Sequence, residues 1–429
     1  MTSKCVAERN LHLTGLYTDK RAVNNRPYII TGGLNNMKAN QNFYKIEQNY
    51  LFAEVAERTA KYSKEHPDAK IIKMGIGDVT LPLCEAVTDA MHKAVSEMGV
   101  KETFKGYGEY RGYDFLCESI AGYYKSFGVD IETEEVFVSE GAKTDLGNIL
   151  DLFDSDNTVL VTDPVYPVYV DTNILAGRKI VYADATEGNN FLPMPDYAVN
   201  ADIIYLCSPN NPTGAAYTRS QLKEWIDYAI SKKAVILLDS AYEAFITDPD
   251  VPHTAYEVEG AKKCVIEICS LSKTAGFTGT RCGYTIVPKA LDFDEDMNKL
   301  WLRRQSTKFN GVSYIVQCGA NAVFTPEGQK GVKENIVYYQ ENAKIMMNAL
   351  DECGIKYFGG KNSPYIWLRC PGGLGSWEFF DKLLAEANVV GTPGEGFGKN
   401  GKGYIRLTSF STHENTEEAM KRLKKMLGK

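Results

Sequence analysis

The sequence predicts an α/β fold in which a mostly parallel central sheet is sandwiched by helices, with a smaller α+β domain attached. Two patterns carry this prediction. Short apolar runs alternate with longer amphipathic stretches from about residue 136 onwards. The run 234–238 is apolar at every position, as expected for a parallel strand that helices cover on both faces. With 429 residues the chain is also long enough for two domains.

The composition is that of an ordinary globular protein, with 44% apolar and 24% charged residues. A formal net charge of −7 offers no basic surface to a phosphodiester backbone, so we expect no nucleic-acid partner. No apolar run approaches the roughly 20 residues that span a bilayer, so we expect no membrane association. The 10 cysteines and 5 histidines show neither a disulfide framework nor metal-ligand spacing. We therefore expect a cytoplasmic protein without a metal site.

Residues 1–41 are expected to be an N-terminal extension of low structural content. They are rich in Asn and turn formers and lack the apolar segment of a secretory signal. A modest excess of basic residues leaves organellar targeting by residues 1–36 open, and Met37 could itself be a start codon. Residues 42–82 are interpreted as an aromatic arm, an amphipathic helix and a short strand that enters a turn at Gly77. We assign this segment to the arm and to part of the small domain.

Residues 83–310 are expected to form the large domain. We predict helices at 83–98, 145–153 and 300–305, strands at 136–139, 158–162, 202–207 and 234–238, and a further helix after the capping box of Thr218 and Gln221. Ligands of open α/β sheets bind at the carboxyl ends of the strands. The candidate residues at these ends are Ala142, Lys143, Tyr166, Asn211, Asp239 and Tyr242.

The segment 270–281 follows another apolar run and carries the chemistry of a phosphorylated aldehyde. Lys273 could form an imine, provided that burial and a neighbouring cation such as Arg281 lower the pKa of its amine. Ser270, Ser272 and Arg281 could donate hydrogen bonds to a phosphate. The alternative for this segment alone is a surface loop with an ordinary solvated lysine.

Residues 311–429 are expected to form the small C-terminal domain. The pattern predicts helices at 329–353 and 377–387 and strands at 365–369 and 403–408. Arg406 alternates with Ile405 and Leu407, so it points away from the face that they bury. It is either a clamp for a carboxylate or a solvent-facing arginine. The glycine-rich segment 394–398 lacks the context of a dinucleotide fingerprint, and we interpret it as a mobile loop.

Taken together, these residues match the functional groups of pyridoxal phosphate. Over residues 42–427 the chain resembles the fold type I aminotransferases of the aspartate aminotransferase superfamily. Within this superfamily it is similar to the LL-diaminopimelate aminotransferase family. The segments that carry the resemblance are 50–52, 75–80, 163–171, 239–242, 272–279 and 309–311.

The resemblance implies a fold type I PLP-dependent transferase that works as a homodimer with shared active sites. Lys273 would be the Schiff-base lysine, Asp239 would pair with the ring nitrogen, and Tyr107 would reach the cofactor phosphate from the partner subunit. Asn310 would contact the cofactor as well. The substrate would be lined by Tyr50, Gly77, Lys143, Tyr166, Asn211, Asn310 and Arg406, with Arg406 on the α-carboxylate.

The implied reaction is a transamination of LL-2,6-diaminopimelate with 2-oxoglutarate, giving tetrahydrodipicolinate and glutamate in lysine biosynthesis. One departure concerns the tyrosine loop, where the family has a glutamate that recognises the distal end of the substrate. Here Tyr110 occupies that position and Glu109 comes one residue early. Either Glu109 takes over the contact or the substrate preference has changed. Alternatives are an aminotransferase for lysine, aromatic or alanine-like donors, a lyase or decarboxylase on this fold, and a non-catalytic PLP-binding protein.

Overall fold

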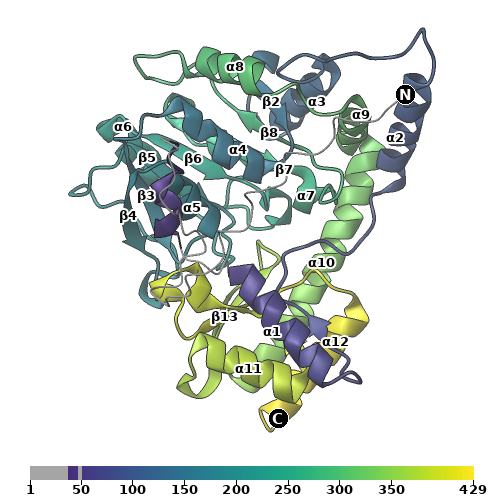
Figure 1. Ribbon diagram of the computed structural model, residues 1–429, viewed down its shortest axis with the longest axis vertical. Coiled ribbons are helices and arrows are strands. Elements are labelled where there is room, and N and C mark those ends of the chain that lie inside the picture. Colours follow the sequence, from purple (N-terminus) through teal and green to yellow (C-terminus); the bar gives the residue numbers. More distant parts are fainter. Residues whose placement is uncertain (1–36, 47–50) are drawn as a thin grey trace, which may run out of the picture.

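The computed structural model describes residues 37–46 and 51–429. A seven-stranded sheet in the order β2-β8-β7-β6-β5-β3-β4 forms the centre of the larger part (Figure 1). Its strands are β2 (Val136–Ser139), β3 (Thr158–Asp163), β4 (Lys179–Asp184), β5 (Ile203–Cys207), β6 (Val235–Asp239), β7 (Val265–Ser270) and β8 (Gly283–Ile286). Strand β8 runs antiparallel to both of its neighbours, β2 and β7, and the other neighbouring strands pair in parallel. The predicted α/β fold with a mostly parallel sheet is confirmed.

Alternate residues of the strands β2, β3, β5, β6 and β7 enter two different apolar cores, which explains the continuous apolar runs. In β6, Val235 and Leu237 join the core with α4, α5 and α8, whereas Ile236 and Leu238 join the core with α3 and α6. The helices that cover the two faces are α3 (Asp114–Lys125), α4 (Ala142–Asn148), α5 (Pro167–Leu175), α6 (Arg219–Lys232) and α8 (Met297–Lys308). Burial of both faces fixes the carboxyl ends of the strands, where the candidate residues lie.

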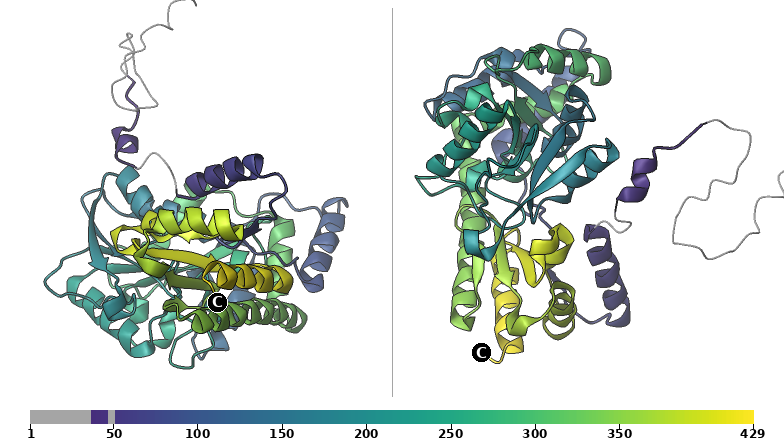
Figure 2. Two further views of the ribbon diagram at one scale, coloured as in Figure 1. Left: turned by 90° about the horizontal axis from the view of Figure 1, so that it is seen from below. Right: turned by 90° about the vertical axis from the view of Figure 1, so that its left-hand side faces the viewer.

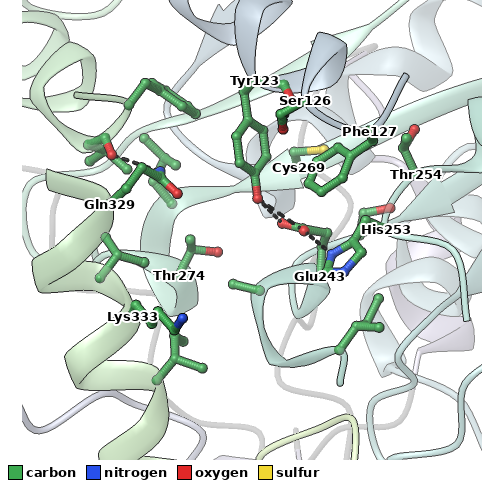
Figure 3. Close-up of a pocket in the computed structure, with 18 of the residues that line it drawn as sticks. Tyr123, Ser126, Phe127, Glu243, His253, Thr254, Cys269, Thr274, Gln329 and Lys333 are labelled. Atoms are coloured by element: carbon green, nitrogen blue, oxygen red, sulfur yellow. Dashed lines mark hydrogen bonds and ion pairs between the residues drawn. The ribbon is translucent and has the colours of Figure 1, made fainter. Parts of the chain in front are cut away.

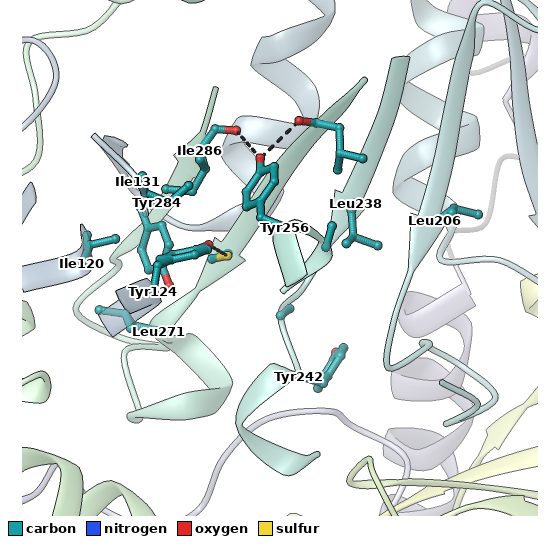
Figure 4. Packing of buried hydrophobic residues seen from close by; sticks show 14 of the residues in the cluster. Ile120, Tyr124, Ile131, Leu206, Leu238, Tyr242, Tyr256, Leu271, Tyr284 and Ile286 are labelled. Atoms are coloured by element: carbon teal, nitrogen blue, oxygen red, sulfur yellow. Dashed lines mark hydrogen bonds between the residues drawn. The ribbon is translucent and has the colours of Figure 1, made fainter. Parts of the chain in front are cut away.

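Figure 4 shows the second of these cores, in which Ile120 and Tyr124 of α3 lie beside Tyr284 of β8. The hydroxyl of Tyr256 lies 3.2 Å from the carbonyl oxygen of Val265 and 3.3 Å from that of Ile286. Leu271, the first residue of α7 (Leu271–Thr274), belongs to the same core. The short helix that bears Lys273 is therefore anchored by apolar packing.

The smaller part contains an antiparallel sheet in the order β12-β13-β10-β9 and a parallel pair, β1 with β11. These strands are β1 (Ile72–Lys73), β9 (Tyr357–Gly359), β10 (Tyr365–Arg369), β11 (Val389–Val390), β12 (Thr392–Pro393) and β13 (Tyr404–Thr408). The helices around them are α1 (Leu51–Glu65), α11 (Ser376–Ala387) and α12 (His413–Met426), as Figure 2 shows from two further sides. Val55 and Met74 share its core, so the segment before the large sheet packs here.

The long helix α10 (Pro326–Cys353) runs through both parts (Figure 1). Val332 and Ile336 belong to a core of the larger part, and Met346 and Leu350 to the core of the smaller part. Helices α2 (Glu85–Met98) and α9 (Tyr314–Val323) pack against each other beside the amino-terminal half of α10. We propose that the two domains divide within α10 rather than at residue 311.

Some local predictions need correction. The helix expected at 145–153 begins at Ala142 and continues from Ile149 to Leu152 as a 3₁₀ helix. The segment 394–398 is not a mobile loop, because Gly394–Phe397 forms a packed 3₁₀ turn in which Phe397 is 2% exposed. In the described residues no helix is long and apolar enough to cross a membrane, and no cluster of three potential metal ligands is found.

Candidate active site

A cavity of about 400 Å³ lies at the carboxyl ends of the central strands, against the smaller part. It brings together most of the predicted site residues from seven separate stretches of the chain. They are Gly77, Ala142, Lys143, Tyr166, Asn211, Asp239, Tyr242, Ser270, Ser272, Lys273, Arg281 and Arg406. Lys273 and Asp239 thus share one cavity although 34 positions separate them in the sequence.

Among the described residues, the predicted site residues Tyr107 and Asn310 do not line this cavity. Tyr107 and Asn310 line another cavity of about 300 Å³, and Tyr107 is 90% exposed. Glu109 and Tyr110, the two residues of the divergent tyrosine loop, line a third cavity away from Lys273. Tyr50 lies outside the described residues.

Asp239 ends β6 as a buried carboxylate. Its Oδ2 accepts a hydrogen bond of 2.7 Å from the hydroxyl of Tyr169, and its Oδ1 accepts one of 3.1 Å from the backbone N–H of Ala241. Burial raises the pKa of Asp239, and within the described chain only these two neutral donors oppose the effect. A cationic ligand group would complete the pairing of this carboxylate.

Lys273 lies on α7, which begins directly after β7. Burial lowers the pKa of its amine to about 8, and the nearby charges of Arg281 and Arg406 act in the same direction. Asp78 opposes this shift. The amine therefore has a substantial neutral fraction near physiological pH, as a nucleophile or a general base requires.

Arg281 forms one wall of the site together with a turn at Gly141. Its Nη1 donates a hydrogen bond of 3.2 Å to Oγ of Ser272, and the backbone of Arg281 has a positive φ of 65°. Gly141 has a φ of 111°, and a Cβ placed there would come within 2.8 Å of Nη2 of Arg281. The glycine is needed both for this backbone conformation and for the approach of the guanidinium to the start of α4.

Arg406 is 1% exposed, which excludes the alternative of a solvent-facing arginine. Its Nη1 donates to Oδ1 of Asn211 at 2.6 Å, its Nη2 donates to the carbonyl of Gly75 at 2.7 Å, and its Nε has no partner among the described residues. The ring of Tyr365 lies 4.3 Å from its guanidinium carbon. The charge of Arg406 is thus held by neutral groups and can pair with the carboxylate of a ligand.

Two aromatic residues of the site were missed by the sequence analysis. Tyr169 hydrogen-bonds Asp239, and its spacing of three from Tyr166 on the first turn of α5 could have indicated a shared position. Tyr365 lines the cavity and shares a 2.8 Å hydrogen bond with Tyr242 through their hydroxyls. No local signal in the sequence distinguishes Tyr365 from an ordinary buried strand residue.

The family model for aminotransferase class I and II matches residues 69–423. A relative from Methanosphaera stadtmanae, named LL-diaminopimelate aminotransferase, is 53% identical over 409 residues and covers 91% of this chain and 99% of its own length. A relative of the same name from Parabacteroides distasonis is 53% identical over 406 residues, with 90% and 99% covered.

Among solved structures, the chain is similar to L,L-diaminopimelate aminotransferase from Chlamydomonas reinhardtii. The TM-score is 0.86 at 42% identity, and the match covers 92% of this chain and 99% of the other. Substrate-bound BacF from Bacillus subtilis matches with a TM-score of 0.79 at 29% identity, with 91% and 98% covered. Both similarities extend over the large and the small part alike.

Proposed function

Because this chain belongs to the class I and II aminotransferases, we propose that it transfers an amino group from LL-2,6-diaminopimelate to 2-oxoglutarate with pyridoxal phosphate as cofactor. The products would be tetrahydrodipicolinate and glutamate. One observation carries the proposal: a lysine of lowered pKa, a buried carboxylate and a buried arginine line a single cavity. Full-length relatives that bear the diaminopimelate name support the choice of substrate.

The residues of the cavity fit the cofactor group by group. Asp239, which only neutral donors contact, suits a protonated ring nitrogen. Arg281, Ser270 and Ser272 suit the phosphate, and the missing side chain of Gly141 leaves room for the guanidinium of Arg281 beside the start of α4. Tyr166 suits a ring face, while Asn211 and Tyr242 suit the ring hydroxyl.

When bound, pyridoxal phosphate supplies an electron-withdrawing ring that stabilises negative charge at the α-carbon of the amino substrate. Asp239 would keep the ring nitrogen protonated, because a buried anion next to it favours the charged form. Lys273 would accept the α-proton at Nζ and later in the same amino transfer donate a proton back. A group that acts first as a base and then as an acid requires a pKa near the working pH. Its value of about 8 meets this requirement.

Arg406 would bind the α-carboxylate of both the donor and 2-oxoglutarate. Asn211 and Gly75 orient its guanidinium through two short hydrogen bonds, so little side-chain freedom is lost on binding. Tyr365 packs against the guanidinium and helps to exclude water from the pair. A correctly placed carboxylate also fixes the α-carbon relative to Lys273.

We also propose that the protein is a homodimer in which each copy completes the site of the other. Tyr107 is almost fully exposed and shares a cavity with Asn310 rather than with Lys273. A partner subunit over this surface would give both residues a position beside the neighbouring cofactor. Light scattering should give twice the mass of the chain, and Tyr107→Phe should weaken cofactor binding.

The decisive experiment is a half-reaction of the purified holoenzyme with single amino donors, followed by the absorbance of the bound cofactor. We expect LL-diaminopimelate and glutamate to convert the cofactor to its amine form and lysine to react at least about tenfold more slowly. Meso-diaminopimelate tests the stereochemistry. A cofactor that responds to aromatic or alanine-like donors but not to LL-diaminopimelate would assign another donor, and one that responds to no donor would indicate a non-catalytic protein.

A further inference from the structure

A second, larger cavity of about 640 Å³ lies behind α7, between α3, the segment 240–254 and the amino-terminal half of α10 (Figure 3). Of the residues assigned to amino transfer above, only Ser270 lines it. We propose that this cavity binds a small anion with an apolar body, of the aryl- or alkyl-carboxylate class, as a site separate from the amino-transfer site.

The dimensions and the walls suit such a ligand. Sites for small molecules usually measure about 300–1,000 Å³ and are mostly apolar with a few polar groups. Here Tyr124, Phe127, Leu271, Phe324 and Ile336 provide apolar surface. An aromatic or aliphatic body of the ligand would replace water against these side chains.

One side of the cavity carries a hydrogen-bonded group that does not repel an anion. In Figure 3, Tyr123 and His253 converge on Glu243. The hydroxyl of Tyr123 lies 3.0 Å from both carboxylate oxygens, and Nδ1 of His253 lies 2.6 Å from Oε1. The hydrogen bond with Glu243 raises the pKa of His253, which favours the imidazolium form. In that form the ring would balance the charge of the carboxylate and keep Nε2–H as a further donor.

The opposite side, formed by α10, carries two cations. Lys330 and Lys333 lie one helical turn apart and are exposed. Neither forms an ion pair within residues 37–46 and 51–429, whereas many other surface lysines of the protein do. Figure 3 shows Lys333 and Gln329 on α10, across from His253. An anionic group on the ligand would find its charge partner here.

The other buried acid of this cavity does not cancel that preference. Glu267 is 1% exposed and accepts hydrogen bonds from Tyr124, Thr254 and Ser240. Burial raises its pKa to about 7. The cavity thus has unpaired positive charge on one wall, a polar pair without net charge on the other, and apolar surface between them. This combination favours an amphipathic anion.

The position of the cavity gives a bound ligand contact with the catalytic helix. Leu271 and Thr274 of α7 line it from behind, while Lys273, which lies between them in the sequence, lines the other cavity. The hydroxyl of Thr274 donates a 3.3 Å hydrogen bond to the carbonyl of Ser270, which closes α7 against β7. A ligand in the second cavity therefore packs against the back of the helix that presents Lys273.

The test is calorimetric titration of the holoenzyme with 4-phenylbutanoate, with saturating glutarate present to occupy Arg406. We expect one site per chain with a Kd of about 1 mM or tighter, and at least about tenfold weaker binding of the neutral 4-phenylbutanamide. The double variant K330Q/K333Q should weaken 4-phenylbutanoate binding about tenfold or more. Lys344→Gln, an exposed lysine on the same helix outside the cavity, should have no effect.

A blocking variant tests the location independently of charge. Val337 lines the cavity and is 40% exposed, so Val337→Trp can fill the space without disturbing the core. We expect it to abolish binding and to leave the basal transamination rate unchanged. The proposal is overturned if no binding occurs up to about 10 mM. It is also overturned if glutarate displaces 4-phenylbutanoate. The same conclusion follows if the parent protein binds 4-phenylbutanamide as tightly as 4-phenylbutanoate and the K330Q/K333Q variant binds 4-phenylbutanoate as tightly as the parent does.

Discussion

Asp239 and Glu267 are buried carboxylates on the neighbouring strands β6 and β7, yet the chain satisfies them to different degrees. Asp239 accepts two hydrogen bonds and lines the cavity that contains Lys273. Glu267 accepts four, from three hydroxyls and from the backbone N–H of Ala255, and lines the cavity behind α7. A carboxylate offers about four acceptor positions, so only Glu267 has its capacity filled by the protein.

The difference separates a structural acid from an acid that is reserved for a ligand. Both carboxylates have raised pKa values because burial disfavours their charged forms. For Glu267 the surrounding donors belong to the fold and are present at all times. For Asp239 the acceptor positions without a protein donor belong to a side chain that lines a cavity. A cation bound there would offset part of the free-energy cost of burying the carboxylate, and this gain would contribute to the affinity for the ligand. Substitutions should therefore separate activity from stability at these positions.

The largest effect on turnover is expected for a substitution of Lys273, which lines the same cavity as Asp239. Lys273→Ala removes the group that moves the α-proton, and kcat should fall by about 10⁴-fold. Formation of glutamate from 2-oxoglutarate measures this loss. Lys344→Ala, which removes an exposed lysine outside both cavities, is the matched control. If the Lys273 variant kept more than about one per cent of the activity, another base would have to be assigned.

Asp239→Asn should lower kcat by about 10³-fold, because a neutral amide does not hold the ring nitrogen protonated. The stability of the cofactor-free protein should change by less than about 1 kcal/mol, since the amide oxygen can still accept one of the two hydrogen bonds and no buried charge remains. Chemical denaturation and steady-state rates measured on the same preparation make the comparison. If Asp239→Asn lost stability markedly but kept normal turnover, Asp239 would have to be assigned a structural role instead of a role in cofactor binding.

Arg406→Lys keeps the positive charge but loses the planar fork that Asn211 and Gly75 orient. We expect kcat/KM for the amino donor and for 2-oxoglutarate to fall about 100-fold each, mainly through KM. Equal losses for both substrates are the signature of a shared carboxylate site. A loss confined to one substrate would contradict the role of Arg406 in both half-reactions.

The smallest effect on turnover, and the clearest on stability, is expected for Glu267→Gln. Four donors surround this side chain, and the amide group would place its own N–H₂ against some of them, at a cost of about 1–3 kcal/mol. The turnover per folded enzyme should stay within about threefold of the parent. If turnover collapsed while the denaturation midpoint stayed unchanged, the contrast with Asp239 would fail.

We also expect Glu267→Gln to change how the free energy of unfolding depends on pH. The pKa of Glu267 is raised in the folded protein from 4.5 to about 7, so folding favours the protonated form. The associated stability is fully present below pH 4.5 and is lost as the pH rises through about 7. Between these limits the stability of the parent should fall with rising pH relative to that of the Gln variant. Denaturation curves at several pH values measure the difference between the two proteins.

The sequence predicted the site residues that lie on strands better than the contacts that form between separate elements. Asp239 follows a run that is apolar at every position, and Arg406 alternates with two buried residues, so strand periodicity alone located both. The fold class followed from the same runs. Helices α3, α9 and α12 and the edge strand β4 were not predicted. The sequence of α12 nevertheless carries a helical period, since its buried residues are Thr416, Ala419, Met420 and Leu423.

The contacts that needed tertiary structure were not accessible from the sequence. Tyr169 reaches Asp239 across 70 positions, and Tyr365 reaches Tyr242 across 123. Tyr107 and Asn310 were placed by resemblance, and the single chain leaves both outside the cavity of Lys273. The cavity behind α7 was not predicted either, since Glu243, His253 and Lys333 have no shared pattern in the sequence.

Helix α10 has a mechanical consequence. It contains 28 residues and is therefore roughly 42 Å long, with one end beside the catalytic helix and the other within the part that carries Arg406. A rigid rod of this length works as a lever: a tilt of about 5° at its amino-terminal end swings the far end by roughly 4 Å. Any tilt of α10 at its end beside α7 would therefore change the position of the part that carries Arg406 by more than the displacement beside α7 itself.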